Sequence, residues 1–301
     1  MRLVFVHGIN QQGQDPDELR RIWIADIEKG MGRPGALSGV PVDMPYYGDI
    51  LADLASSNTR GAIAQGPDPQ LDEERAQFLA EGLAEQAQEM GITPQQIAEE
   101  QERDSAQTSD AVDMGFPMSR RINAIARVLE RLSPFRGDLA LRLLDQAHAY
   151  LKRTDVGSAV DAEVAPTLRP HPVVLVTHSL GTVVSFKLLR QFANEGSPVE
   201  VPLFVTLGSP LPLTTVQKAL QPPFTTPTGV ARWLNARDPD DFITLNRGLR
   251  PPRFADSIEN LNDVRNLAMG GKDAHAIPGY LAHPRVARAI GDVLGLVPPA
   301  S

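Results

Sequence analysis

Residues 171–186, HPVVLVTHSLGTVVSF, change from a strand-like pattern to a helix-like one at His178-Ser179. The run Val173 to Thr177 is mostly apolar and rich in β-branched residues, which is typical of a buried strand in a parallel sheet. Leu180 to Asn194 has apolar residues at helical spacing. The stretch therefore predicts a strand that turns directly into a helix, with a histidine and a serine at the turn.

A serine at such a turn has the surroundings that a nucleophile requires. The helix N-terminus offers free N–H groups and the positive end of the helix dipole, and both stabilise an oxyanion. Strand and helix crowd together there, so small residues are favoured two positions before and two after the serine, in the pattern G-x-S-x-G. Gly181 fits this pattern, whereas Thr177 departs from it. We interpret Ser179 as a candidate nucleophile; the plainer alternative is a buried serine that caps a helix.

Strands and helices alternate on both sides of this turn. We expect strands over residues 3–6, 40–47, 173–177, 201–207 and 229–235, and a final helix over residues 284–294. The first strand is followed by a helix that runs to about Lys29, with Asp15 or Asp17 as its N-cap. Because helices separate the strands, the sequence predicts an α/β class with a mainly parallel sheet that helices cover on both faces.

The alternation is interrupted between about residue 50 and residue 165, where no strand pattern is found. Within this region, Thr93-Pro94-Gln95-Gln96 has the features of a helix start, with threonine as the N-cap and glutamine three residues later. Apolar residues then recur at helical spacing: Ile122, Ile125, Leu129, Leu132, Leu139, Leu143, Ala147 and Leu151. We expect three to five helices inserted between two strands, within a single domain that spans residues 1–301.

The amino-acid composition excludes several classes of binding partner and of functional site. The chain of 301 residues carries a net charge of −8, and an acidic protein repels phosphate backbones, so we expect no nucleic-acid partner. It has no cysteine, which excludes disulfides, thiolate nucleophiles and cysteine-based zinc sites. The longest apolar run, residues 172–186, falls short of the roughly 20 residues of a membrane span, and the N-terminal apolar stretch is too short for a signal peptide. We expect a cytoplasmic protein without stable membrane insertion; its oligomeric state is not predicted.

Two segments together carry a resemblance to a known family. VFVHGIN (residues 4–10) and VVLVTHSLGT (residues 173–182) resemble the corresponding parts of the α/β-hydrolase superfamily, and in particular its lipase/esterase-like branch. LFVTLGSPLPL (residues 203–213) and RWLNARDPDDFITL (residues 232–245) look like the same branch, so the resemblance covers most of the expected sheet. It implies the α/β-hydrolase fold, with residues 50–165 as a helical cap or lid.

The resemblance also implies which groups bind the oxyanion. In that branch, the residue after His-Gly and the residue after the nucleophile each donate a backbone N–H, and these residues are Ile9 and Leu180 here. Gly8 and His7 belong to the same loop, on the oxyanion and substrate side. His7 is expected in a structural or substrate-side role rather than as the base.

The acid of the site is expected after the nucleophile and before the base, because the family follows the chain order Ser, Asp or Glu, His. Asp241 and Asp238 both lie in the loop after the fifth expected strand, and Asp240 between them is less suited. Asp241 is preferred because Asp241-Phe242-Ile243 resembles the family pattern D-x-V. Asp238 stays a candidate because it stands closer to the end of the strand.

The base is then sought after this loop, where the chain has His275 and His283. His275 lies in GGKDAHAIPGYL (residues 270–281), a glycine-rich loop ahead of the final helix, where the family places its base. His283 directly precedes Pro284 at the start of that helix, which favours a capping or packing role. We therefore prefer His275.

These residues would form a Ser-His-Asp site that cleaves a carboxylic ester through an acyl-enzyme, without a metal or organic cofactor. The expected substrate is a small-molecule or lipid acyl ester, and four apolar residues of the insertion either line the acyl site or fill the core of the cap: Phe78, Leu79, Leu83 and Met90. The chain lacks H-E-x-x-H, the P-loop pattern and the dinucleotide glycine fingerprint, which disfavours metallohydrolases, P-loop enzymes and Rossmann dehydrogenases. The alternative is a catalytically inactive α/β-hydrolase-fold binding or scaffold protein.

Overall fold

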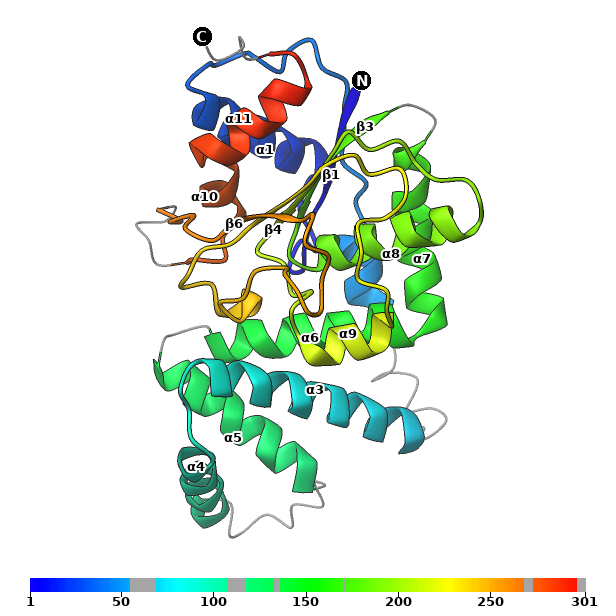
Figure 1. Ribbon diagram of the computed structural model, residues 1–301. Helices are drawn as coiled ribbons and strands as arrows, with labels where there is room; N and C mark the ends of the chain where they lie inside the picture. Colours follow the sequence, from blue (N-terminus) through cyan, green and yellow to red (C-terminus); the bar gives the residue numbers. More distant parts are fainter. Residues whose placement is uncertain (55–68, 108–116, 133–135, 170–171, 268–272, 297–301) are drawn as a thin grey trace.

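A parallel sheet forms the centre of the molecule (Figure 1). The computed structural model describes residues 1–54, 69–107, 117–132, 136–169, 172–267 and 273–296. Within these ranges, six strands pair in the order β2-β1-β3-β4-β5-β6, and all five pairings are parallel. The strands are β1 (Arg2–Val6), β2 (Val42–Asp43), β3 (Val173–His178), β4 (Leu203–Leu207), β5 (Trp233–Ala236) and β6 (Glu259–Leu261). The predicted α/β class with a parallel sheet is confirmed.

Helices cover both faces of this sheet. One face carries α1 (Pro16–Met31), α10 (Ile277–Leu281) and α11 (Pro284–Val293), which contact one another. The other carries α8 (Leu180–Asn194) and α7 (Thr154–Val164), the latter followed by a short 3₁₀ helix (Ala165–Leu168). Leu3 and Phe5 of β1 pack into the first layer, whereas Val4 and Val6 pack into the second. Successive residues of a strand point to opposite faces, so a run that is apolar throughout is buried on both sides.

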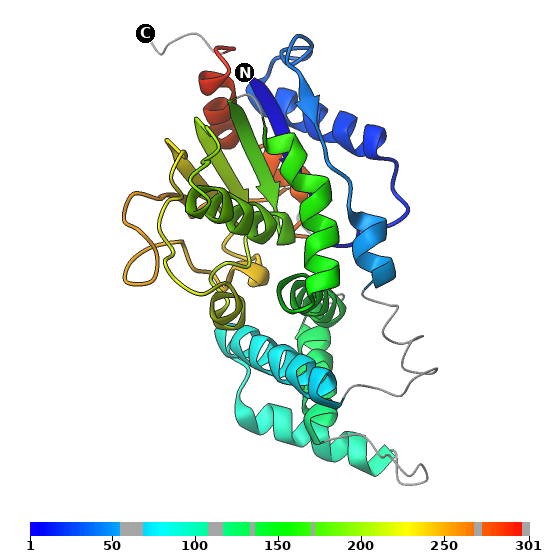
Figure 2. The same ribbon diagram turned by 90° about the vertical axis from the view of Figure 1, so that its right-hand side faces the viewer.

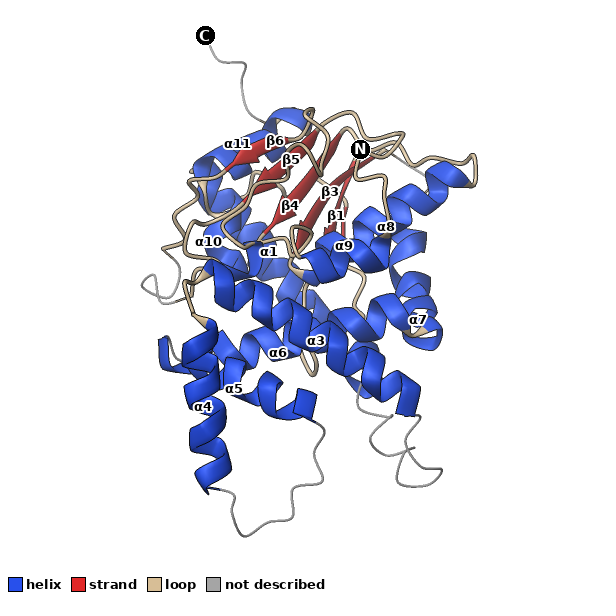
Figure 3. Cartoon of the chain, turned by 60° about the horizontal axis from the view of Figure 1, so that its bottom comes forward, coloured by secondary structure: helices blue, strands red, loops and turns tan. Residues whose placement is uncertain are grey.

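Most of the predicted insertion forms a helical layer beyond the carboxyl ends of the strands, whereas its last helix, α7, packs beside α8 on a face of the sheet (Figures 1 and 2). The layer contains α3 (Pro69–Glu89), α4 (Pro94–Gln107), α5 (Pro117–Leu132) and α6 (Arg136–Lys152), and residues 48–54 ahead of it are also helical. Residues 55–68, 108–116 and 133–135 of the predicted insertion lie outside the described residues. A further helix, α9 (Thr214–Leu220), contacts α3 and α6 and so links the layer to the loop after β4 (Figure 3). None of the helices in the described part of the chain is both long and apolar enough to cross a membrane.

Local signals in the sequence predicted two helix starts correctly. The Asp15 carboxylate accepts from the backbone N–H groups of Asp17 and Glu18 at the start of α1, so Asp15 and not Asp17 is the N-cap. Before α4, the Thr93 hydroxyl accepts from Gln96 N (3.3 Å), and the Gln96 side chain accepts from Thr93 N (2.8 Å). This reciprocal pair is a capping box.

The edges of the sheet differ from the prediction. The strand expected over residues 40–47 pairs with β1 only at Val42 and Asp43, and the strand expected over residues 229–235 begins at Trp233. β6 was not predicted, because Glu259-Asn260-Leu261 is short, polar and at the edge of the sheet. Edge strands are half-solvated, so they do not require the continuous apolar run that identifies a central strand.

The order of the strands indicates where a site belongs. The chain passes from β1 outward to β2, then returns to place β3 on the other side of β1. In open α/β sheets, ligands bind beyond the carboxyl ends of the strands at the point where the strand order reverses. This point lies at the ends of β1 and β3, where residues 7–9 and Ser179 follow.

Candidate functional site

Ser179 lies at the turn between β3 and α8. Its backbone has φ 52° and ψ −126°, a conformation with positive φ that non-glycine residues rarely adopt. Its N–H donates to the carbonyl of Leu207 at the end of β4 (3.0 Å), and its carbonyl accepts from the N–H of Thr182 (3.0 Å). These bonds hold the strained turn, and such strain concentrates at functional sites.

Glycines on both sides of this turn allow the close approach that the sequence pattern predicted. A Cβ on Gly181 would lie 2.3 Å from the carbonyl oxygen of Val6, and a Cβ on Gly8 would lie 2.6 Å from the Cβ of Ser179. The loop after β1 is therefore pressed directly against the serine. Thr177, which departs from the glycine pattern, is accommodated in β3, where its hydroxyl donates to the carbonyl of Val205 (2.8 Å).

We expect Gly181→Ala to lower the free energy of unfolding by about 3 kcal/mol, because its methyl group meets backbone oxygens that cannot move without displacing β1. The measurement is urea-induced unfolding followed by circular dichroism. Gly39→Ala is the matched control, since a Cβ there meets nothing within 4 Å. Equal stability of the two variants would contradict the close packing at the turn.

Three side chains from distant parts of the chain form one hydrogen-bonded series. His275 Nε2 lies 3.0 Å from Ser179 Oγ, and His275 Nδ1 lies 2.9 Å from Asp241 Oδ2. Ser179 follows β3, Asp241 precedes a 3₁₀ turn (Phe242–Thr244) in the loop after β5, and His275 precedes α10. Their exposed fractions are 1%, 1% and 7%. The structure thus brings together one predicted nucleophile, one predicted acid and the predicted base, although residues 270–272 of the glycine-rich loop lie outside the described residues.

The surroundings of His275 set its charge. Burial lowers the pKa of this imidazole, but the charge of Asp241 and its hydrogen bond outweigh burial and raise the pKa above the ordinary value of 6.5. The carboxylate therefore stabilises the imidazolium. When His275 is neutral, a proton on Nδ1 is shared with Asp241, which leaves Nε2 as an acceptor for the proton of Ser179 Oγ.

Asp241 is held by two further donors. The hydroxyl of Tyr280 donates to Oδ2 (2.7 Å), and the N–H of Ile243 donates to Oδ1 (3.1 Å). Tyr280 is fully buried, and burial together with the charge of Asp241 raises the pKa of its phenol well above the usual value, so the phenol stays a donor. Gly208, with φ 55°, lies against Asp241 and His275, because a Cβ on it would be 2.9 Å from Asp241 Oδ2 and 3.0 Å from His275 Nδ1. The carboxylate is fixed in orientation.

Asp238, the other predicted acid, does not contact His275. Its oxygens accept from the N–H of Asp240 (2.8 Å) and the N–H of Asn266 (2.5 Å). The Asn266 amide donates in turn to the carbonyls of Ala274 and Ala276, on either side of His275 in the sequence. Asp238 therefore supports the loop of His275, and Asp240 is exposed and paired with Arg265.

A second histidine, His178, is hydrogen-bonded to the backbone of His275. His178 Nε2 donates to the backbone carbonyl of His275 (2.8 Å), and the two rings lie 4.7 Å apart. Burial, followed by the charge of His275, lowers the pKa of His178 well below its ordinary value, so it stays neutral. Sequence reasoning assigned no role to His178, Tyr280 or Asn266, although a tyrosine in the otherwise apolar IPGYL was a signal for the second.

The predicted oxyanion loop is rigid. His7 is fully buried and stacks on Tyr47, with ring centroids 4.0 Å apart. Both of its ring nitrogens form hydrogen bonds: Nδ1 donates to the carbonyl of Gly8 (2.8 Å), and Nε2 accepts from the N–H of Tyr47 (3.2 Å). Burial lowers the pKa of His7 to about 4, so it is a neutral brace and not a base. Within the described residues, no acceptor is found for the N–H of Ile9 or for that of Leu180, the first residue of α8.

The remaining candidates contribute less to the site. His283 is the N-cap residue of α11, as its sequence position favoured, and it makes no side-chain capping bond. Phe78, Leu79 and Leu83 of α3 pack into the same buried apolar cluster as Ile9 and Leu180, with Met90 at its border. Among the described residues, no group of three or more histidine, aspartate or glutamate side chains is arranged to hold a metal ion.

The comparisons with known proteins give no family for this chain. No protein-family model matches it, and a search of curated proteins finds no match.

Proposed function

We propose that this protein is a serine hydrolase of the α/β-hydrolase fold, with Ser179, His275 and Asp241 as its catalytic triad. The observation that carries the proposal is the continuous series of hydrogen bonds from Ser179 Oγ through the imidazole to Asp241. A serine nucleophile requires a base within hydrogen-bond reach and a third group that orients the base. The parallel sheet, the strained turn at its switch point and the chain order Ser, Asp, His support the lipase/esterase-like branch.

Two backbone N–H groups supply the oxyanion site of this proposal. Leu180 N is at the N-terminus of α8, directly after the nucleophile, and Gly8 brings the peptide group of Ile9 against Ser179. Donors that have no other acceptor are oriented before the substrate binds, so they stabilise a developing oxyanion without a cost of reorganisation.

The reaction then follows from the geometry. Ser179 Oγ attacks the acyl carbonyl carbon while His275 Nε2 takes the hydroxyl proton, and the N–H groups of Ile9 and Leu180 bind the oxyanion. The intermediate collapses as His275 returns the proton to the leaving alcohol, which gives an acyl-enzyme on Ser179. Water, activated by the same imidazole, releases the acid and restores the serine. Asp241 stabilises the imidazolium in each step, and no metal or organic cofactor takes part.

The proposed substrate is a carboxylic ester with a short or medium acyl chain, from a small molecule or a lipid. A buried apolar cluster joins α3, through Phe78 and Leu83, with Ile9 and Leu180 beside the nucleophile. An apolar acyl group that entered between these side chains would be stabilised by roughly 0.8 kcal/mol for each buried methylene. The serine machinery cleaves esters more readily than amides, because alcohols are better leaving groups than amines.

A fluorophosphonate probe tests the proposal. We expect the wild-type chain to be labelled covalently, because the serine oxygen displaces fluoride from the probe to form a phosphonate ester only when a base and oxyanion donors activate it. Ser179→Ala should not be labelled, whereas Ser185→Ala should be labelled like the wild type. Ser185 is the matched control because it is also fully buried and lies in α8, which begins directly after Ser179. Peptide mass spectrometry identifies the labelled residue.

A wild-type chain that stays unlabelled, while circular dichroism shows it folded, would favour the inactive binding or scaffold protein over the hydrolase. Labelling that persists in Ser179→Ala would assign the reaction to another residue.

A further inference from the structure

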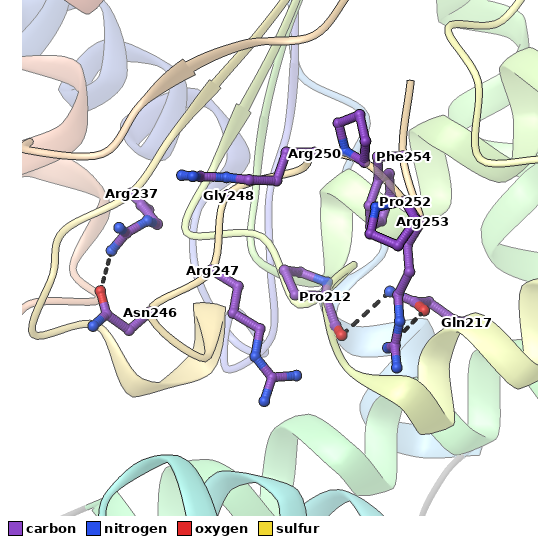
Figure 4. Close-up of a pocket in the computed structure, with 11 residues that line it drawn as sticks. Pro212, Gln217, Arg237, Asn246, Arg247, Gly248, Arg250, Pro252, Arg253 and Phe254 are labelled. Atoms are coloured by element: carbon purple, nitrogen blue, oxygen red, sulfur yellow. Dashed lines mark hydrogen bonds between the residues drawn. The ribbon is translucent and has the colours of Figure 1, made fainter. Parts of the chain in front are cut away.

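Four arginines line a cavity of about 680 Å³ between the loop after β4, α9 and residues 246–254 (Figure 4). They are Arg237, Arg247, Arg250 and Arg253, and the described residues that line the cavity include no aspartate or glutamate. Its volume is within the range of small-molecule sites. Such a concentration of positive charge is unexpected in a chain with a net charge of −8.

Within the described part of the chain, only one of these arginines forms ion pairs with acidic side chains. Arg247 pairs with Glu85 (2.8 Å) and Glu89 (3.1 Å) of α3. Arg253 donates to the neutral oxygens of Thr214 and Gln217, at 3.1 Å each. For the exposed guanidinium of Arg250, no acceptor is found among the described residues. Arg250 and Arg253 therefore present uncompensated charge to the cavity.

Arg237 gives the strongest indication of an anion site, because its side chain is buried and its hydrogen-bond partners are neutral. It is 9% exposed, and its guanidinium donates to the amide oxygens of Asn246 and Asn262. Burial, followed by the charge of Arg250, lowers the pKa of Arg237, although arginine stays protonated. The carboxylate of Asp238, the next residue, is already engaged by two backbone N–H groups. Within the described residues, no carboxylate is hydrogen-bonded to this guanidinium, and the charges of Asp238 and Glu89 do not outweigh burial and Arg250, so its charge is only partly balanced and favours an anion in the cavity.

We propose that this cavity binds a small molecule that carries a phosphate group. Three guanidinium groups without carboxylate partners exceed the charge of one carboxylate, whereas a phosphate monoester carries about −1.5 to −2 at pH 7 and three acceptor oxygens. The organic part of the ligand packs against the apolar lining formed by Phe254 and Pro212. The cavity is built by loops that also hold Asp238 and Ser209, but the proposal does not depend on hydrolysis by Ser179.

Isothermal titration of the 301-residue chain with phenyl phosphate, at fixed ionic strength and in a phosphate-free buffer, tests this site. We expect one molecule bound per chain, with affinity unchanged in Ser179→Ala. Arg250→Gln and Arg253→Gln should each weaken binding by about tenfold or more, because each removes a charge-assisted hydrogen bond. Both side chains are exposed, so the variants should fold. Arg142→Gln on α6, which removes an exposed arginine paired with Asp138, is the matched control and should bind like the wild type.

Absence of binding to the wild-type chain at millimolar concentration would overturn the proposal. So would equal affinities in wild type and Arg250→Gln, or an equal loss in Arg142→Gln, which would indicate a general effect of net charge. Benzoate that binds as tightly as phenyl phosphate would overturn the assignment to phosphate.

Discussion

Replacing Ser179 by alanine is expected to lower kcat for a p-nitrophenyl acyl ester by on the order of 10⁶-fold, and His275→Ala is expected to have a similar effect. The double variant should be no less active than either single variant. The two residues act as one unit, since Ser179 Oγ has no base without His275 Nε2, 3.0 Å away, and the imidazole has no nucleophile to activate without the serine. The measurement is a double-mutant cycle of initial rates over a series of acyl chain lengths.

This cycle separates a catalytic unit from two residues that matter only for stability. Effects that simply add would place the double variant far below the single variants, and would contradict the proposed triad. The Ser185→Ala chain is the matched control and should keep the wild-type rate, because its hydroxyl makes no hydrogen bond within the described residues. If the wild-type chain had no activity on any ester of the series, the proposal that its substrate is a carboxylic ester would be contradicted.

The centre of the fold could be predicted from sequence because its strands are buried on both faces. The run from Val173 to Val176 is apolar throughout because β3 is buried on both faces, and such a run is easily recognised. The edges were predicted less well: the strand expected over residues 40–47 pairs at only two residues, and β6 was missed because it needs only Leu261 buried. The inserted helices were predicted as a class, because their periodicity is local, but nothing local predicts that α9 from the loop after β4 contacts α3 and α6.

Some residues of the candidate site could likewise be predicted from the sequence, whereas others could not. Ser179 could be found because the turn imposes glycine at 181, a constraint within five residues of sequence. The choice between Asp241 and Asp238 could not be made from spacing, since both follow β5 and both are buried. Their difference lies in partners from elsewhere in the chain, because Asn266 engages Asp238 and leaves Asp241 to His275. The cavity arginines are spread over 17 positions of loop sequence without a motif, so only the folded chain brings them together.

Asp241→Asn is expected to lower kcat by on the order of 10⁴-fold. The asparagine amide cannot accept at both of its positions, so it favours the tautomer of His275 with the proton on Nε2, which cannot take the proton of Ser179. Asp238→Asn is the matched control, since it makes the same change in the same loop on a carboxylate that does not contact the base. Its effect should stay within about tenfold, because it weakens only the support that Asn266 gives to the loop.

The pH dependence of kcat/KM provides a second readout that a merely structural role of Asp241 would not change. In the wild type, the rate requires neutral His275, whose pKa is raised above 6.5, so the acidic limb of the profile should have its midpoint above pH 6.5. In Asp241→Asn the carboxylate that raised this pKa is absent while burial still lowers it, so the residual rate should titrate at lower pH. In Asp238→Asn the limb should stay at its wild-type position. A limb that moves in Asp238→Asn and stays fixed in Asp241→Asn would exchange the roles of the two carboxylates.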